Sequence, residues 1–186
     1  MSFKLVVLGG SLGAVQALRT ILADLPADFP LPLAAVLHRG DDHGMLSGTV
    51  ATESALPVAD AGDKEPLAPG RVFLAPADYH LLVESNHLAL STEAPVHFAR
   101  PAIDVLFDSA ADVYRDRLVG VLLTGANRDG AAGLAHIKEQ GGLTVVQDPA
   151  TAEEGTMPAA ALALAEHKIL PLQEIGLFLY NLGREK

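Results

Sequence analysis

Short apolar runs alternate with longer amphipathic stretches along most of this 186-residue chain. Apolar runs of about five residues bounded by turn residues are typical of buried strands, and apolar residues at helical spacing are typical of helices. Two runs, Leu33 to Leu37 and Leu118 to Leu123, are hydrophobic at nearly every position. Parallel strands that are covered by helices on both faces have this composition. The alternation therefore predicts an α/β fold with a doubly wound, mainly parallel sheet flanked by helices.

The expected elements keep this alternation at both ends of the chain. Strands are predicted at residues 3–8, 33–38, 118–124, 143–147 and 168–170, and helices at 13–24, 44–54, 101–116, 130–140, 157–166 and 173–182. Pro101 favours a helix start at its position, because proline is common at the first helical residue. After Pro57 the pattern changes, and we expect a strand at 71–75 and a small antiparallel hairpin, as an insertion or edge, from 81–84 and 87–90.

Composition limits the function classes. The chain is long enough to bury one core and shows no repeat or linker, so we expect residues 1–186 to form a single domain. Its net charge of −10, from 13 Lys and Arg against 23 Asp and Glu, repels polyanions, and nucleic acid is therefore not an expected partner. The absence of cysteine excludes disulfides, thiolate metal sites and a thiol nucleophile. The apolar runs are all shorter than a membrane span, so we expect no membrane insertion and a cytoplasmic location.

A glycine-rich turn, Gly9 to Gly13, follows directly on the first predicted strand and holds Ser11 at its centre. This is the sequence form of a nucleophile elbow, in which a sharp strand-to-helix turn presents a serine in a sterically costly geometry beside helix-start N–H groups. Similar turns bind dinucleotides, but Leu8 stands where that fingerprint has its first glycine. Asp24 and Asp28 also lie too near the turn to bind a ribose, so the nucleotide interpretation is disfavoured.

Three residues with complementary chemistry fall at the carboxyl ends of predicted strands: Ser11, His38 and Asp129. The carboxyl ends of parallel strands share one edge of a sheet, where functional groups collect. A serine hydroxyl needs an imidazole to take its proton, and the imidazole needs a carboxylate to fix its tautomer and stabilise its charged form. The sequence therefore indicates a catalytic triad of these three residues.

Each of the three also has a simpler interpretation. Serine and aspartate are common helix caps, Ser11 for the first helix and Asp129 for the helix expected to begin at Gly130. His38 alone is interpreted as a solvated loop histidine. The triad hypothesis depends on all three residues coinciding at one edge of the sheet.

The other histidines show no metal-pair spacing, so their spacing predicts no metal site. We interpret them as surface or structural residues: His43, His80, His87, His97, His136 and His167. His80 and Arg100 lie in turn-rich segments and are candidates for the rim of a cleft, although a surface histidine and a helix-start arginine are the simpler interpretations.

Taken together, the motifs resemble those of the catalytic domain of chemotaxis protein-glutamate methylesterases, the CheB family. The resemblance extends from the first strand to the Met157-Pro158 segment and includes the serine turn and the histidine that ends the second strand. It also includes four further segments: Gly70 to Pro76 with Asp78 and His80, Arg100 to Phe107, Leu123 to Gly125, and Asp129 to Gly133.

The resemblance implies a doubly wound α/β domain and a serine hydrolase that demethylates glutamyl methyl esters on chemoreceptors or related signalling proteins, and that in some members deamidates glutamines. It implies Ser11 as nucleophile, His38 as general base and later acid, and Asp129 as the group that orients His38. No metal or organic cofactor is implied.

Several positions depart from the family pattern. Members usually have a hydroxyl residue after the nucleophile and a glycine two positions further on, where this chain has Leu12 and Ala14. The turn before the aspartate is commonly Gly-Met-Gly-Asn-Asp-Gly, and here Ala126 replaces the methionine while Arg128 adds a charge. Arg39 to Asp41 replace a proline-containing stretch. These changes alter the expected substrate pocket and oxyanion contacts and leave room for a different native substrate.

The regulatory form of the family carries an amino-terminal receiver domain, and this chain starts at the first strand of the catalytic domain. We therefore expect a stand-alone version, active without phosphorylation in the same chain. The alternative, from another functional class, is a catalytically degenerate binding module in a chemotaxis-like signalling pathway. The retention of all three triad residue types favours the enzyme.

Overall fold

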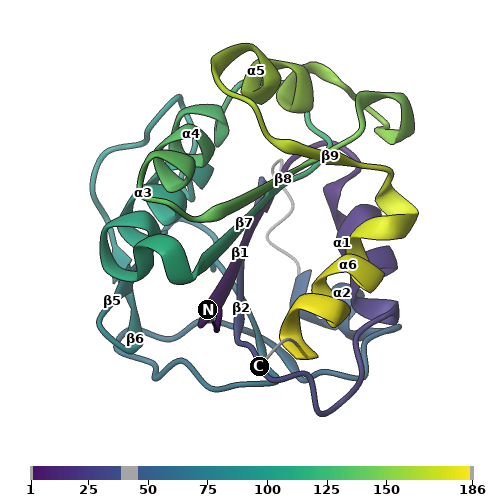
Figure 1. Ribbon diagram of the computed structural model, residues 1–186. Coiled ribbons are helices and arrows are strands. Elements are labelled where there is room, and N and C mark those ends of the chain that lie inside the picture. Colours follow the sequence, from purple (N-terminus) through teal and green to yellow (C-terminus); the bar gives the residue numbers. More distant parts are fainter. Residues whose placement is uncertain (1, 39–45, 185–186) are drawn as a thin grey trace.

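A seven-stranded sheet, in which every neighbouring pair of strands is parallel, forms the centre of the computed structural model, which describes residues 2–38 and 46–184 (Figure 1). The strand order is β3-β4-β2-β1-β7-β8-β9. The strands are β1 (Leu5–Gly10), β2 (Leu33–Leu37), β3 (Val58–Asp60), β4 (Val72–Leu74), β7 (Leu118–Leu122), β8 (Leu143–Gln147) and β9 (Lys168–Leu170). A separate antiparallel hairpin consists of β5 (His80–Glu84) and β6 (His87–Ser91).

Helices cover both faces of the sheet (Figure 1). One face carries α1 (Ala14–Ala23), α2 (Leu46–Ala51) and α6 (Leu172–Arg184). The other carries α3 (Ile103–Tyr114), α4 (Ala131–Glu139) and α5 (Thr156–Leu164), and the hairpin packs beside α3. Two short 3₁₀ turns, Arg115–Arg117 and Pro149–Thr151, complete the assignment. None of the helices in the described ranges is long and apolar enough to cross a membrane.

The sheet divides the apolar interior into two cores. Side chains of β1 alternate between them, because successive residues of a strand point to opposite faces. Leu5 and Val7 pack under α3, α4 and α5, while Val6 and Leu8 pack under α1, α2 and α6, and all four are fully buried. This two-sided burial explains why the central strands are hydrophobic at consecutive positions.

The predicted fold class is confirmed, including the small hairpin with its turn at Ser85 and Asn86. The sequence pattern missed β3, because this three-residue edge strand is only partly buried and ends in Asp60. The predicted helix start at Pro101 is wrong, since α3 begins at Ile103 after an N-cap at Ala102. The predicted helix at 44–54 is observed as Leu46–Ala51, and residues 44 and 45 lie outside the described ranges.

The strands on the two sides of the central strand β1 come from different parts of the chain. The strands β2, β3 and β4, which follow β1 in the sequence, lie on one side of it, and the later strands β7, β8 and β9 lie on the other. The carboxyl ends of strands at such a switch in direction border a crevice in doubly wound folds. The segments that follow β1, β2 and β7 meet at this point.

Candidate active site

Backbone hydrogen bonds hold the three strand ends together. The N–H of His38, directly after β2, donates to the carbonyl of Gly10 at 3.0 Å. The N–H of Ser11, directly after β1, donates to the carbonyl of Thr124 beyond β7 at 2.9 Å. Ser11 therefore lies between the other two strand ends.

Close packing brings Ser11 against the segment after β7. A Cβ atom at Gly125 would lie 3.0 Å from Ser11 Cβ and 2.6 Å from Met157 Cε, so only glycine allows this approach. The hydroxyl of Thr124 donates to the carbonyl of Leu12 at 2.9 Å and accepts the N–H of Glu154 at 2.9 Å. The serine turn is thus tied to both β7 and the segment before α5.

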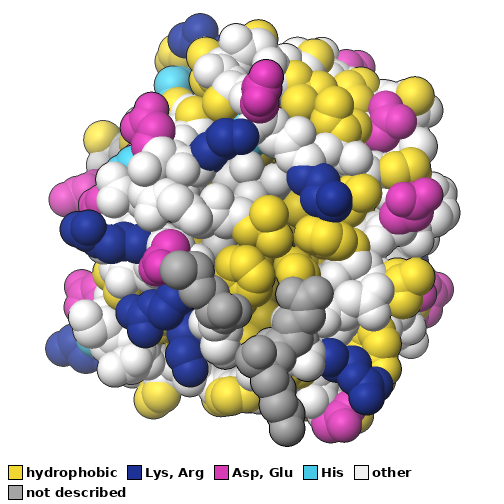
Figure 2. All heavy atoms as spheres, in the orientation of Figure 1, with side chains coloured by type: hydrophobic (Ala, Val, Ile, Leu, Met, Phe, Trp, Pro, Cys, Tyr) yellow, Lys and Arg dark blue, Asp and Glu magenta, His cyan; other side chains and the backbone are white. Residues whose placement is uncertain are grey.

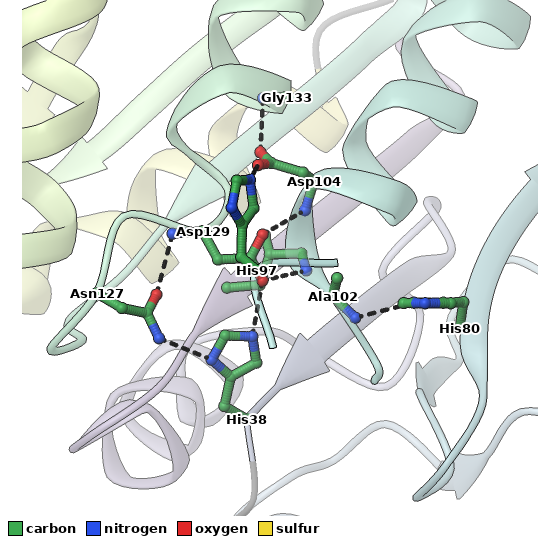
Figure 3. Close-up of polar contacts among 9 residues, drawn as sticks. His38, His80, His97, Ala102, Asp104, Asn127, Asp129 and Gly133 are labelled. Carbon is green, nitrogen blue, oxygen red and sulfur yellow. Dashed lines mark hydrogen bonds and ion pairs between the residues drawn. The ribbon is translucent and has the colours of Figure 1, made fainter. Parts of the chain in front are cut away.

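His38 and Asp129 form the central polar contact of the site (Figure 3). Nε2 of His38 lies 2.7 Å from Oδ2 of Asp129, although the two residues are 91 positions apart in the sequence. The Asp129 side chain is 1% exposed and that of His38 12% exposed. The predicted histidine–carboxylate pair is present, whereas the side chains of Ser11 and His38, both in the described part, form no hydrogen bond.

The carboxylate of Asp129 also caps α3. Its Oδ2 accepts the N–H of Ile103 at 2.7 Å and its Oδ1 accepts the N–H of Asp104 at 3.0 Å. Burial favours the neutral acid, but the hydrogen bond from His38 and those from the α3 N–H groups outweigh it and lower the pKa of Asp129. The site therefore holds an ionised carboxylate where it can stabilise a charged imidazole.

Asn127 also contacts His38. Its Oδ1 accepts the N–H of Asp129 at 3.0 Å, and its Nδ2 lies 3.3 Å from Nδ1 of His38. Because Asp129 is a carboxylate, the His38 proton between them belongs to Nε2, and Nδ1 is left with its lone pair. The basic nitrogen of this histidine is therefore Nδ1.

Asp104 supports the capped end of α3. It is 6% exposed, its Oδ1 accepts the N–H of Gly133 in α4 at 2.7 Å, and its Oδ2 lies 3.2 Å from Nε2 of His97. Burial raises the pKa of Asp104, with the nearby Asp129 adding to the effect against the Gly133 hydrogen bond. Asp104 joins α3, α4 and the turn that contains His97 around the site (Figure 3).

Three predictions about local geometry need correction. The left-handed backbone angle of the serine turn falls on Gly13, with φ of 79°, and not on Ser11, so Ser11 is not held in the strained conformation of a nucleophile elbow. Ser11 does not cap α1 through its side chain, because the N-cap of α1 is Gly13. Asp129 caps the distant α3 rather than the helix that follows it, whose N-cap is Gly130.

His80 and Arg100, the two candidates for the rim of a cleft, form hydrogen bonds with the backbone near α3. His80 is 1% exposed and not a surface histidine: its Nδ1 accepts the N–H of Ala102, and its Nε2 bonds the carbonyl of Ala94. The Arg100 guanidinium donates to the carbonyls of Thr92 and Glu93. Both residues hold the segment between the hairpin and α3.

Among the departures from the expected pattern, Leu12, Ala126 and Arg128 are exposed, whereas Ala14 is buried. The three exposed residues lie beside Ser11 and Asp129 in the sequence and so border the site. The departure at Arg39 to Asp41 lies outside the described residues, as does His43. Among the residues that the structure describes, no three His, Asp or Glu side chains form a group able to hold a metal ion.

A cavity of about 580 Å³ lies at the opposite edge of the sheet, between the N-terminal segment, residues 30–32, the hairpin turn and the ends of α3 and α6. Figure 2 shows the face that carries both termini, with hydrophobic side chains gathered in its middle and charged ones around them. No residue of the triad hypothesis lines this cavity. The cavity is therefore separate from the candidate active site.

Comparison with protein families decides the identity of this arrangement. The family model described as CheB methylesterase matches residues 6–179. The chain belongs to the CheB methylesterase family. The predicted family, and with it the enzyme class of a protein-glutamate methylesterase-like ester hydrolase, is confirmed.

Individual relatives of the CheB methylesterase family extend this result. A putative protein-glutamate methylesterase/protein-glutamine glutaminase of Leptospira interrogans is 43% identical over 178 residues, covering 94% of this chain and 92% of that protein. Protein-glutamate methylesterase/protein-glutamine glutaminase 2 of Anaeromyxobacter dehalogenans is 45% identical over 183 residues, covering 97% of this chain but 54% of that protein. The chain thus spans about half the length of the second relative.

A solved structure of the family has the same fold. The crystal structure of the Thermotoga maritima CheB methylesterase catalytic domain superposes with a TM-score of 0.91 at 32% identity, covering 98% of this chain and all of that one.

The sequence interpretation did not single out Asn127, Asp104 or His97 as site residues. The signal for Asp104 was its place in the Arg100 to Phe107 segment, and the signal for Asn127 was its place in the turn before Asp129, whereas nothing in the sequence marked His97 as a site residue.

Proposed function

We propose that this CheB-family protein hydrolyses glutamyl methyl esters on a protein substrate, with Ser11 as nucleophile, His38 as general base and acid, and Asp129 as the orienting carboxylate. The observation that carries the proposal is the 2.7 Å contact between His38 and the buried Asp129, beside Ser11 at the meeting point of three strand ends. Ser, His and a carboxylate gathered at one edge of a sheet are the parts of a serine hydrolase.

The reaction follows from the tautomer of His38. Nδ1 takes the hydroxyl proton as Ser11 Oγ bonds to the ester carbonyl carbon, and Asp129 stabilises the resulting imidazolium through Nε2. The tetrahedral intermediate expels the methoxy group, which leaves as methanol with the proton from Nδ1. Water then gives a proton to Nδ1 and attacks the acyl-enzyme, and Ser11 leaves with that proton as the glutamate is released.

The oxyanion of the tetrahedral intermediate requires donors other than the N–H of Ser11, because that group is bonded to the Thr124 carbonyl. We assign this role to N–H groups in the first turn of α1 other than that of Ala14, which is bonded to the Ser11 carbonyl, since helix N-termini stabilise negative charge. Gly13 carries no side chain, and the Glu153 side chain packs against it, with Oε2 only 2.6 Å from where a Cβ atom would lie.

The substrate we propose is a methylated chemoreceptor or a related signalling protein in the cytoplasm. The names of the relatives, protein-glutamate methylesterase/protein-glutamine glutaminase, support a glutamyl ester on a protein, and the choice of a chemoreceptor follows the resemblance to the chemotaxis methylesterases. The second activity in those names, release of ammonia from a glutamine side chain, uses the same acyl-enzyme chemistry, and we include it as a secondary activity. Residues 1–186 form the catalytic unit in this proposal, without metal or organic cofactor.

The test is methanol release from receptor cytoplasmic fragments that have been methylated with adenosylmethionine. Ser11→Ala should lower turnover by a factor of about 10⁴ or more, by analogy with other triads. Ser85→Ala, on the hairpin turn away from the site, is the matched control and should retain the wild-type rate. Undiminished release by Ser11→Ala would reject the proposed nucleophile.

An absence of release from all three proteins would direct attention to a different ester or amide, or to the binding-module alternative. A fluorophosphonate probe separates these two outcomes, because it modifies an activated serine whatever the natural substrate is. Labelling of wild type but not of Ser11→Ala keeps the hydrolase proposal, while absence of labelling favours a binding role.

A further inference from the structure

The side-chain amide of Asn127 bridges the backbone of Asp129 and the imidazole of His38 (Figure 3). The orientation of this amide is decided by its first contact. A backbone N–H can only donate, so the atom 3.0 Å from the N–H of Asp129 is the amide oxygen. The amide nitrogen, which can only donate, therefore faces Nδ1 of His38 at 3.3 Å.

Both ring nitrogens of His38 are thus committed in the resting protein. Nε2 donates its proton to Asp129, and Nδ1 accepts a hydrogen bond from Asn127. A neutral imidazole has one lone pair available as a base, and here the amide of Asn127 occupies it. Ser11 forms no hydrogen bond with His38 in the described structure.

The contact between Asn127 and His38 is favourable in the resting state and becomes unfavourable during the reaction. When Nδ1 takes up a proton from Ser11, the ring N–H and the amide N–H groups become two donors that face each other. The Asn127 contact therefore stabilises the resting state and disfavours the protonated intermediate. Asn127 is exposed, so its side chain can leave the imidazole without disturbing the core.

We propose that Asn127 is a positioning residue that holds Nδ1 of His38 in the resting enzyme and slows proton transfer from Ser11 until the amide is displaced. The inference rests on the proposed function, since it takes Ser11 as the proton donor. It adds to that function an internal restraint, which substrate binding at this exposed turn would release.

The experiment measures the second-order rate constant for modification of Ser11 by a fluorophosphonate. In Asn127→Ala we expect this constant to rise about three- to tenfold, the range that corresponds to loss of one neutral hydrogen bond. Asn127→Asp keeps an oxygen for the N–H of Asp129 but presents a carboxylate oxygen to Nδ1. This acceptor favours a proton on Nδ1, so the constant should fall below the wild-type value.

A purely structural role gives the opposite order. If Asn127 only braced the turn through the N–H of Asp129, Asn127→Asp would retain the wild-type rate and Asn127→Ala would be slower, and this result would overturn the inference. Asn181→Ala, which changes an exposed asparagine in α6, is the control and should match wild type.

Nitrogen NMR of the His38 imidazole gives a readout that does not depend on catalysis. In Asn127→Ala the Nδ1 resonance should move toward that of a free imine nitrogen, while the Nε2–H signal stays in place because Asp129 holds it. An unmoved Nδ1 resonance would overturn the inference. If the probe labels neither wild type nor Ser11→Ala, the proposed nucleophile fails, and the Nδ1 resonance still decides whether Asn127 occupies that nitrogen.

Discussion

Asp129 shows how one side chain serves both the site and the fold. Its carboxylate accepts hydrogen bonds from His38, Ile103 and Asp104 while almost fully buried. Asp104, directly beside it, is also buried, but its pKa is raised, whereas the pKa of Asp129 is lowered. The two carboxyl groups therefore make opposite contributions to the pH dependence of stability.

Substitution of each aspartate by asparagine should reveal this opposition. A lowered pKa means that Asp129 stabilises the fold above its unfolded value, near 3.8, and that this contribution is lost as pH falls through the lower folded value. The stability difference between wild type and Asp129→Asn should thus shrink as urea unfolding is measured at progressively more acidic pH. A raised pKa means that the contribution of Asp104 is complete below 3.8 and is lost as pH rises through the folded value.

The Asp104→Asn difference should accordingly shrink in the other direction, from acidic pH toward neutral pH. Each variant serves as the control for the other, since both remove one carboxylate from the same end of α3. Parallel pH profiles for the two variants would contradict the assigned directions.

At the scale of elements, the site depends on how closely α3 approaches β1. A Cβ atom at Gly9 would lie 2.2 Å from Cγ2 of Ile103 and 3.2 Å from Cζ of Phe107, so the helix rests directly on a strand position that lacks a side chain. The same residue, Ile103, donates its N–H to Asp129. The seat of α3 on β1 thus determines whether the helix N-terminus reaches the site carboxylate.

Gly9→Ala should therefore destabilise the protein by about 1–3 kcal/mol, the usual cost of overpacking a core. It should also lower the rate of Ser11 labelling, because a displaced α3 pulls Ile103 away from Asp129. Gly48→Ala in α2 is the matched control: its Cβ meets nothing within 4 Å, so stability should be unchanged or slightly higher. Equal urea midpoints for both variants would refute the packing argument.

The elements themselves could be predicted from the sequence better than their mutual contacts. Apolar periodicity placed Ser11, His38 and Asp129 at strand ends, and parallel strands bring such ends to one edge. Periodicity carries no information on contacts between residues 26 positions apart, such as Asp129 and Ile103, so Asp129 was interpreted as a cap of the wrong helix. The ring nitrogen of His38 that faces the carboxylate and the contact from Asn127 depend on side-chain geometry, so the sequence could not predict them either.

For the whole molecule, the net charge of −10 governs encounters with other polymers. Nucleic acid, whose backbone carries negatively charged phosphates, is repelled at long range, and this repulsion is strongest at low salt. We therefore predict no retention of duplex DNA in a filter-binding assay at about 50 mM salt, conditions that favour electrostatic binding. A basic DNA-binding protein run in parallel is the positive control, and DNA retention that weakens with added salt would contradict the prediction.

The position of the site in the sheet also has a consequence for how the protein opens. β1, β2 and β7 are each paired on both sides, whereas the outermost strands are short, with β3 only partly buried and β9 mostly exposed. Native proteins open in steps of unequal free energy, and thinly packed edges open before central strands. Amide hydrogens at the edges should exchange with solvent while those of β1 remain protected. Esterase activity should then survive the first, peripheral opening events and disappear only with global unfolding.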